Sequence, residues 1–274
     1  MPPQQSANPY SFAHQVQADG SVVFECSRDA ALNPWLTLPP HHPVVLQTQS
    51  FWTAVGASTA LQGWEATKWT ALTWIDWELG VASGGHVTVG VYRREGGGEA
   101  ENLGYSLDLF NESGARVVTI QGRGVVFRKR NFEKWREGSK NEALKAGASD
   151  DFVFAHPNAL GLTKQERVLV APLGANAAHI DALVTLENGL APGNPVIGGS
   201  GDHVNSTHFH ELARQALFLI KGRADIDTSG EMTMKRYVEL GTPLQLKVVS
   251  NEADSIGFEL EQLGKPCADI TLRW

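Results

Sequence analysis

The pattern of apolar and polar positions predicts one order of elements that occurs twice along the chain. In the first half, a short strand at 21–26, a proline-rich loop and an apolar helix at 44–61 come before four stretches of strand-like alternation. These four stretches are 69–79, 86–93, 103–110 and 116–129, with a hairpin turn at Asn111-Glu112-Ser113-Gly114. In the second half, a short strand at 183–186 and a helix from 205–207 to about Lys221 precede four more strands. Those strands are expected at 233–240, 244–249, 255–260 and 268–273.

A helix followed by a meander of antiparallel strands is typical of an α+β layer in which the sheet wraps around the helix. This topology resembles the hotdog fold, and its repetition predicts a double hotdog of two tandem units. We expect a flexible N-terminal tail (1–20), a degenerate first unit (21–130), a linker or surface helix (131–151) and a second unit (152–274). In a double hotdog the two halves pack as a pseudo-dimer with the site between them. A monomeric pseudo-dimer or a homodimer is therefore expected.

Composition narrows the class of protein. The chain has 274 residues, 42% of them hydrophobic, and a formal net charge of -7, which argues against a nucleic-acid or acidic-membrane partner. Cys26 and Cys267 are its two cysteines, so no disulfide framework is expected and a reducing compartment is favoured. The first residues do not have the pattern of a signal peptide, and no apolar run of about 18 residues is present. These features predict a cytoplasmic protein.

Candidate chemistry is concentrated in residues 201–216. The apolar positions of the second helix form a core stripe of Phe209, Leu212, Ala213, Ala216 and Ile220. On another face, Arg214 and Gln215 follow Glu211 by three and four positions, so the side chains can meet. This face is either solvated, with an ordinary ion pair, or covered, with Glu211 as a candidate acid or base. If the helix belongs to a double hotdog, this face is expected to be covered by the rest of the protein.

The spacing of Asp202-His203-Val204, Glu211 and Arg214-Gln215-Ala216 resembles the A-factor biosynthesis hotdog family, the gamma-butyrolactone synthases of actinomycete signalling. The resemblance implies transfer of a beta-ketoacyl group from an acyl carrier protein thioester to a three-carbon phosphate acceptor. It also implies that Glu211 is the acid/base, that Arg214 and Gln215 orient it or bind substrate, and that His203 flanks the thioester. Asn205-Ser206-Thr207 stands where the family has Pro-Gly-Met.

The catalytic residues expected are thus Glu211, His203 and Arg214. The substrate-binding residues expected are Asp202, Asn205, Thr207, His208, Gln215, Trp52 and Trp74. Amides near Thr207 and His208 at the helix N-terminus are expected to polarise the thioester carbonyl. No metal is expected, because His208 and His210 face apart on a helix and a metal site needs three or four converging ligands. No separate cofactor is expected either, since phosphopantetheine of an acyl carrier protein or CoA would carry the acyl chain.

Other reactions stay open at this stage. His203-Val204-Asn205 resembles the His-Val-Asn stretch of hotdog acyl thioesterases, which hydrolyse such thioesters. Dehydration or hydration of a thioester-bound acyl chain needs a histidine and a carboxylate, which His203 or His208 with Glu211 could supply. A non-catalytic binder of a hydrophobic small molecule, or a cyclase-like protein, is a further alternative.

Overall fold

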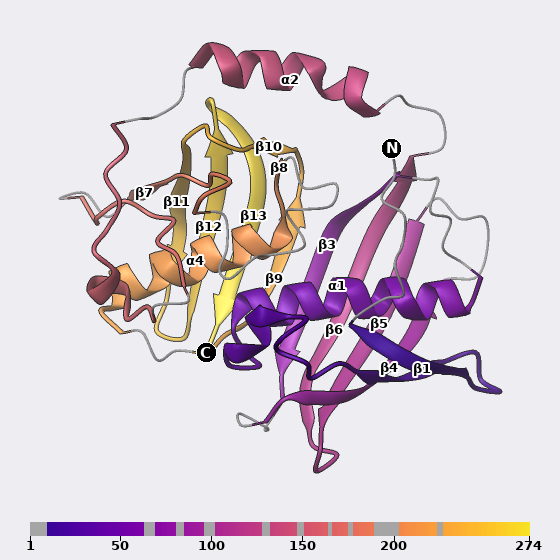
Figure 1. The fold of residues 1–274 in the computed structure, drawn as a ribbon. Helices are drawn as coiled ribbons and strands as arrows, with labels where there is room; N and C mark the ends of the chain where they lie inside the picture. Colours follow the sequence, from indigo (N-terminus) through magenta and orange to yellow (C-terminus); the bar gives the residue numbers. More distant parts are fainter. Residues whose placement is uncertain are drawn as a thin grey trace. The chain divides into compact units, whose positions relative to one another are not determined.

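The computed structural model describes residues 10–62, 69–80, 85–95, 102–127, 132–146, 151–163, 166–174, 178–188, 203–223 and 227–274. The chain divides into two compact units, Met1–Arg128 and Lys129–Trp274. In each unit, a long helix lies against an antiparallel sheet (Figure 1). The predicted α+β organisation of two tandem units is confirmed.

In the first unit, the described residues form the long helix α1, a short 3-10 helix and six antiparallel strands. Its elements are β1 (Ser11–Val16), β2 (Val22–Cys26), the 3-10 helix η1 (Pro34–Thr37), α1 (Pro43–Ala60), β3 (Trp69–Leu79), β4 (Val87–Glu95), β5 (Asn102–Asn111) and β6 (Arg116–Phe127). The strands lie in the order β1-β2-β4-β5-β6-β3. The predicted turn at 111–114 is confirmed, because the Asn111 side chain accepts the amide N–H groups of Ser113 and Ala115, and Gly114 has a positive φ of 75°. The helix and the four strands that were predicted to follow the proline-rich loop are all found.

The N-terminal strand corrects the predicted tail. Residues 1–9 lie outside the described residues, but 11–16, expected to be flexible, form β1 and pair with β2 from Ser11↔Cys26 to Val16↔Val22. Within β1 only Ser11 is buried, whereas Phe12 and Val16 are exposed. The strand therefore has no apolar alternation, which is the signal that a sequence reading uses.

In the second unit, the described residues form the helices α2 and α4, a five-stranded sheet and a small ribbon. Its elements are α2 (Phe132–Ala146), the 3-10 helix η2 (Pro157–Leu160), β7 (His179–Ala182), β8 (His203–Val204), α4 (Ser206–Lys221), β9 (Ser229–Met234), β10 (Val238–Glu239), β11 (Leu244–Asn251), β12 (Ser255–Gln262) and β13 (Lys265–Arg273). The sheet has the order β9-β13-β12-β11-β7, and β10 pairs with β8 in the separate ribbon. The predicted apolar stripe of α4 is confirmed for Phe209, Leu212, Ala213 and Ala216, which are all buried, whereas Ile220 at its end is half-buried.

Two predicted strands of this unit differ from the structure. The strand expected at 183–186 is instead β7, because the Asn188 side chain accepts from the Thr185 amide and turns the chain there. The strand expected at 233–240 is divided into β9 and β10. The amides of Lys235 and Arg236 both donate to the Cys267 carbonyl, which interrupts the regular ladder.

The charged segment at 131–151 contains the helix α2, one of the two forms expected for it. In the part of the chain that the structure describes, no helix is long and apolar enough to span a membrane.

Candidate functional site

The helix α4 begins at a capping box that fixes its first turn. The Asn205 side chain accepts hydrogen bonds from the amides of Thr207 (3.0 Å) and His208 (3.4 Å). In return, the Asn205 amide donates to His208 Nδ1 at 3.1 Å. The same ring nitrogen lies 3.0 Å from Asn205 Oδ1, so both the amide and the side-chain oxygen of the N-cap contact the His208 ring.

This cap corrects one expectation about the site. The amides of Thr207 and His208 were expected to polarise a thioester carbonyl, but both already donate to Asn205. Thr207 and His208 are also buried, with exposed fractions of 2% and 0%. The cap geometry therefore shows a structural role for Asn205 and Thr207, and any role in substrate binding stays a prediction.

One turn further along α4, Glu211 lies in a dense set of hydrogen bonds. Arg214 donates to it twice, from Nε to Oε2 at 2.9 Å and from Nη2 to Oε1 at 2.7 Å. Gln215 Nε2 donates to Oε1 at 2.7 Å. The carboxylate is 2% exposed, so the solvated face that was one of the two readings is wrong. The predicted meeting of the three side chains is confirmed.

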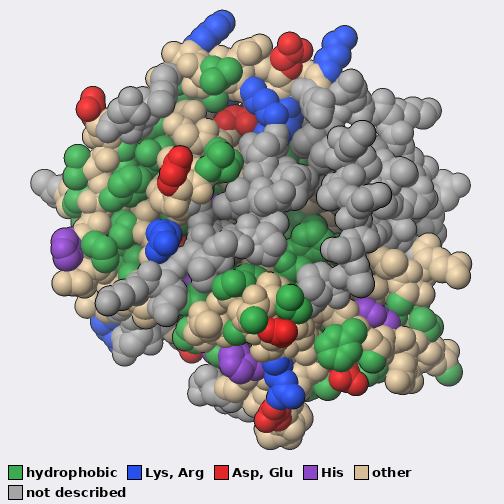
Figure 2. Space-filling view, viewed as in Figure 1, with side chains coloured by type: hydrophobic (Ala, Val, Ile, Leu, Met, Phe, Trp, Pro, Cys, Tyr) green, Lys and Arg blue, Asp and Glu red, His purple; other side chains and the backbone are tan. Residues whose placement is uncertain are grey.

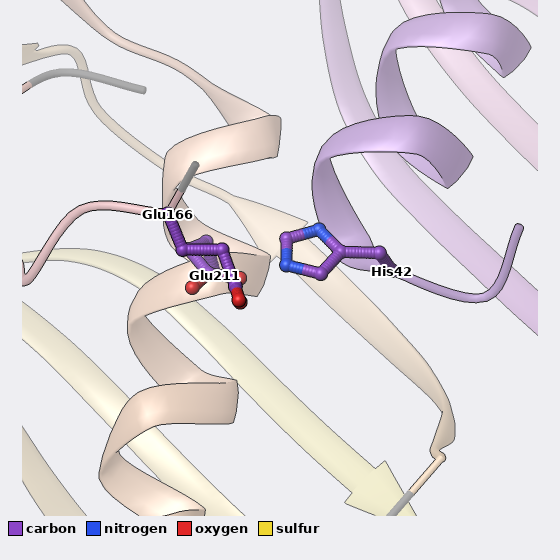
Figure 3. Close-up of side chains that lie close together, drawn as sticks. All are labelled: His42, Glu166 and Glu211. Atoms are coloured by element: carbon purple, nitrogen blue, oxygen red, sulfur yellow. The ribbon is translucent and has the colours of Figure 1, made fainter. Parts of the chain in front are cut away.

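A second carboxylate reaches the same guanidinium from the segment after η2. Glu166 Oε1 accepts from Arg214 Nη2 at 2.5 Å, and its Oε2 accepts from the Thr163 amide at 2.7 Å. Carboxylate oxygens of Glu166 and Glu211 lie within 4.8 Å of each other, and Figure 3 shows the two groups side by side. Sequence analysis missed Glu166, because it lies 45 positions before Glu211 in a loop with no motif.

Gln215 explains how that loop is held on α4. Its Nε2 donates to the Arg167 carbonyl at 2.8 Å, and its Oε1 accepts from the Leu169 amide at 2.9 Å. The side chain is fully buried. One amide therefore both bonds Glu211 and fixes the backbone next to Glu166.

The charge balance of this cluster is uneven. Burial alone would lower the pKa of Arg214, but the Glu211 and Glu166 carboxylates outweigh it and raise that pKa. Two carboxyl groups therefore share one guanidinium. A guanidinium does not give up its proton in proteins, so proton transfer in the cluster belongs to the carboxylates.

His203 lies before the helix on the short strand β8. Its ring packs edge-on against Tyr237, with 4.8 Å between the ring centroids and 74° between the planes. Asp202, expected to bind substrate, lies outside the described residues.

The two tryptophans expected at the site belong to the first unit. Trp52 stacks on Tyr10 with 5.4 Å between ring centroids, and Trp74 lies under the Arg123 guanidinium at 4.7 Å. These contacts are packing contacts, and a role in substrate binding stays a prediction for both.

The first unit has a different residue at the position that corresponds to Glu211. The N-cap of α1 is His42, and Thr48 follows it by six positions, as Glu211 follows the N-cap Asn205. Thr48 is fully buried. A hydroxyl therefore stands at this position of the first unit in place of the carboxylate.

Comparison of the sequence finds no matching family model and no matching curated protein. The structure is similar to an acyl-ACP thioesterase from Bacteroides thetaiotaomicron, with a TM-score of 0.53, 14% identity and coverage of 84% of this chain and 88% of that one. It is also similar to a putative oleoyl thioesterase from Lactobacillus plantarum, with a TM-score of 0.51, 12% identity and coverage of 85% and 88%. A bifunctional dehydratase-cyclase domain in ambruticin biosynthesis has a TM-score of 0.51 and 15% identity, covering 97% of this chain and 95% of that one.

The protein has a double hotdog fold. The predicted fold class is thereby confirmed. At these identities the likeness establishes the fold and not the reaction. Within the second hotdog unit, the carboxylate cluster on α4 is the candidate functional site.

Proposed function

We propose that this double hotdog protein is an enzyme acting on acyl thioesters, with Glu211 as its general base. The observation that carries the proposal is the buried Glu211 carboxylate, which accepts three hydrogen bonds from Arg214 and Gln215. These donors hold both carboxylate oxygens in a defined position, which a general base needs in order to meet its substrate. The names of similar structures, an acyl-ACP thioesterase and an oleoyl thioesterase, support thioesters as the substrate class.

The reaction we favour is acyl transfer. Glu211 takes the proton of a hydroxyl acceptor while the acceptor oxygen attacks the thioester carbonyl. A C–O bond forms, the C–S bond breaks, and the proton passes to the departing thiolate. The resemblance of 202–216 to gamma-butyrolactone synthases supports this choice. It points to a beta-ketoacyl donor carried by acyl carrier protein or CoA in a biosynthetic pathway of the cytoplasm.

Arg214 fixes the orientation of the base in this proposal. Its fork-shaped guanidinium contacts both oxygens of Glu211 and one oxygen of Glu166. His203 would flank the thioester at the start of α4. The reaction as written requires no cofactor beyond the phosphopantetheine arm that carries the acyl chain.

Dehydration is a second candidate, and His208 favours it. His208 precedes Glu211 by three positions, so the two side chains start from one face of α4. In this reaction the His208 ring gives a proton to a departing hydroxyl while Glu211 removes a proton next to the thioester carbonyl. One of the similar structures is a dehydratase-cyclase domain.

Product analysis separates these reactions. The protein is incubated with 3-ketoacyl, 3-hydroxyacyl and saturated acyl thioesters of CoA and of an acyl carrier protein. Free thiol and product mass are then followed, with and without a three-carbon phosphate acceptor. We expect thiol release that depends on the acceptor. Release with free acid alone identifies hydrolysis, and loss of water without thiol release identifies dehydration. No change with any donor overturns the catalytic proposal in favour of a binding protein.

A further inference from the structure

The helix α2 is polar along most of its length, yet one charged side chain is buried. Charged side chains project from the surface over this helix (Figure 2), and Lys145 and Leu144 are exposed. Arg136, in contrast, is 2% exposed. A buried guanidinium on a surface helix needs a specific partner, because its desolvation is costly.

Arg136 has two partners on the segment around β10. Its Nη2 donates to Glu239 Oε2, and its guanidinium lies over the Tyr237 ring at 5.1 Å from the centroid. Glu239 is itself buried, and its other oxygen, Oε1, accepts no hydrogen bond from any residue within the described ranges. The charge of Glu239 is thus balanced by a residue 103 positions earlier in the chain.

Glu239 is firmly placed by the end of β12. The Gln262 side chain accepts from the Glu239 amide at 2.8 Å and donates to the Glu239 carbonyl at 2.9 Å. It also donates to the Thr242 carbonyl. The anchor point for α2 is therefore fixed to the main sheet of the second unit.

The same anchor is continuous with the candidate site. Glu239 pairs with His203 across the β10–β8 ribbon, and Val238 pairs with Val204. The Tyr237 ring that Arg136 covers is the ring against which the His203 imidazole packs. The residue after β8 is Asn205, the N-cap of the helix that bears Glu211.

We infer that Arg136 is a positioning residue, through which α2 fixes the Tyr237 ring and with it the His203 imidazole at the start of α4. Its effect on turnover rests on the proposed function, whereas its effect on the position of His203 does not. The arrangement makes the docking of α2 a condition for an ordered His203. Segments far from α4 in sequence thereby control one side of the site.

The test uses the full chain labelled with 13C at Cε1 of histidine. The His203 resonance is identified as the one that is lost in His203→Gln. The variant Tyr237→Leu then gives the chemical shift of His203 in the absence of the Tyr237 ring. We expect Arg136→Met to move the His203 resonance toward its position in Tyr237→Leu. The matched control is Lys265→Met, which removes the exposed ion pair between Lys265 of β13 and Glu142 of α2. We expect this control to leave the His203 resonance in place.

Turnover provides the second readout. We expect Arg136→Met to lower kcat about 10- to 100-fold with a smaller change in KM, because a misplaced group costs rate rather than binding. An unmoved His203 resonance in Arg136→Met overturns the inference. A moved resonance with unchanged kcat overturns the link to the reaction. If Arg136→Met does not fold, Arg136→Lys is used, which keeps the charge but not the flat stacking surface. A wild-type protein without activity, but with the resonance shift, counts against the proposed function alone.

Discussion

At the scale of single residues, Gln215 connects the base to the loop that brings the second carboxylate. Its amide nitrogen donates to Glu211 and to the Arg167 carbonyl, and its oxygen accepts from the Leu169 amide. Each of these three partners is buried or partly buried, so none can form a hydrogen bond to water in its place if the Gln215 side chain is removed. The residue is thus expected to stabilise the site and the second unit together.

Replacement of Gln215 by leucine tests this role. Gln215→Leu leaves a buried carboxylate oxygen, a carbonyl and an amide without their partner. We expect the free energy of unfolding to fall by about 2–4 kcal/mol, since each unsatisfied buried group costs about 1–3 kcal/mol. Urea-induced unfolding measures it. Gln245→Leu is the control, because that exposed side chain makes an exposed hydrogen bond to Asp181, and its effect is expected within about 0.5 kcal/mol. Equal midpoints for the two variants would contradict the assignment.

Spacing predicted part of this cluster and could not predict the rest. Glu211, Arg214 and Gln215 share one helix, so helical geometry alone brings them together. Glu166 comes from a loop, and its place follows from hydrogen bonds to Arg214 that no local pattern contains. The occupied amides at Thr207 and His208 were missed for a related reason. Asn205 was one of three residues at which the helix was predicted to begin, and it is the N-cap, but the sequence did not show which amides its side chain would bind.

At the scale of elements, the first strand is held on α1 by stacked rings. Tyr10, just before β1, lies between Trp35 of η1 and Trp52 of α1, with centroid distances of 5.6 and 5.4 Å. This contact explains why a segment with little apolar alternation is ordered. Aromatic rings bury much surface and prefer such offset stacks.

The buried phenol of Tyr10 makes the first unit sensitive to alkali. Burial raises the pKa of Tyr10 from 10.0 to about 12, so the native state keeps a proton that the unfolded chain releases. Stability is therefore complete below pH 10 and falls as the pH rises toward 12. We expect Tyr10→Phe to show a weaker fall in urea midpoint between about pH 9 and pH 11.5 than the wild type.

Part of the alkaline fall remains in the variant. Tyr92 and Tyr105 also have a pKa raised by burial, and both are unchanged in Tyr10→Phe. The two proteins are therefore compared by how steeply their urea midpoints fall with pH, since a fall is expected in both. Identical slopes for the two proteins would contradict the role of Tyr10.

Elements with clear periodicity were predicted well, and those defined by tertiary contacts were not. The helix expected at 44–61 is α1, and the strand expected at 69–79 is β3 with the same bounds. β7 was misplaced by a few residues, because the turn around Thr185 depends on the Asn188 side chain. The break between β9 and β10 depends on the Cys267 carbonyl, which belongs to a strand about 30 residues away.

At the scale of the whole molecule, two units of one fold carry different residues at one helical position. Glu211 of α4 corresponds to Thr48 of α1 when the helices are aligned on their N-caps. The fold could be predicted because the order of elements is repeated along the chain. The reaction could not, because transfer, hydrolysis and dehydration all use a base at the same place. The monomeric pseudo-dimer or homodimer expected from the sequence stays a prediction.

The most direct test of the account is the turnover of an acyl thioester by Glu211→Gln. The variant keeps the size of the side chain and removes the base, so we expect turnover to fall about 10²- to 10⁴-fold. Glu142→Gln is the matched control, because its exposed carboxylate pairs with Lys265 and belongs to α2, outside the cluster around Glu211. We expect it to retain wild-type turnover, and urea-induced unfolding verifies that both variants are folded. Near-normal turnover by a folded Glu211→Gln would contradict the central claim.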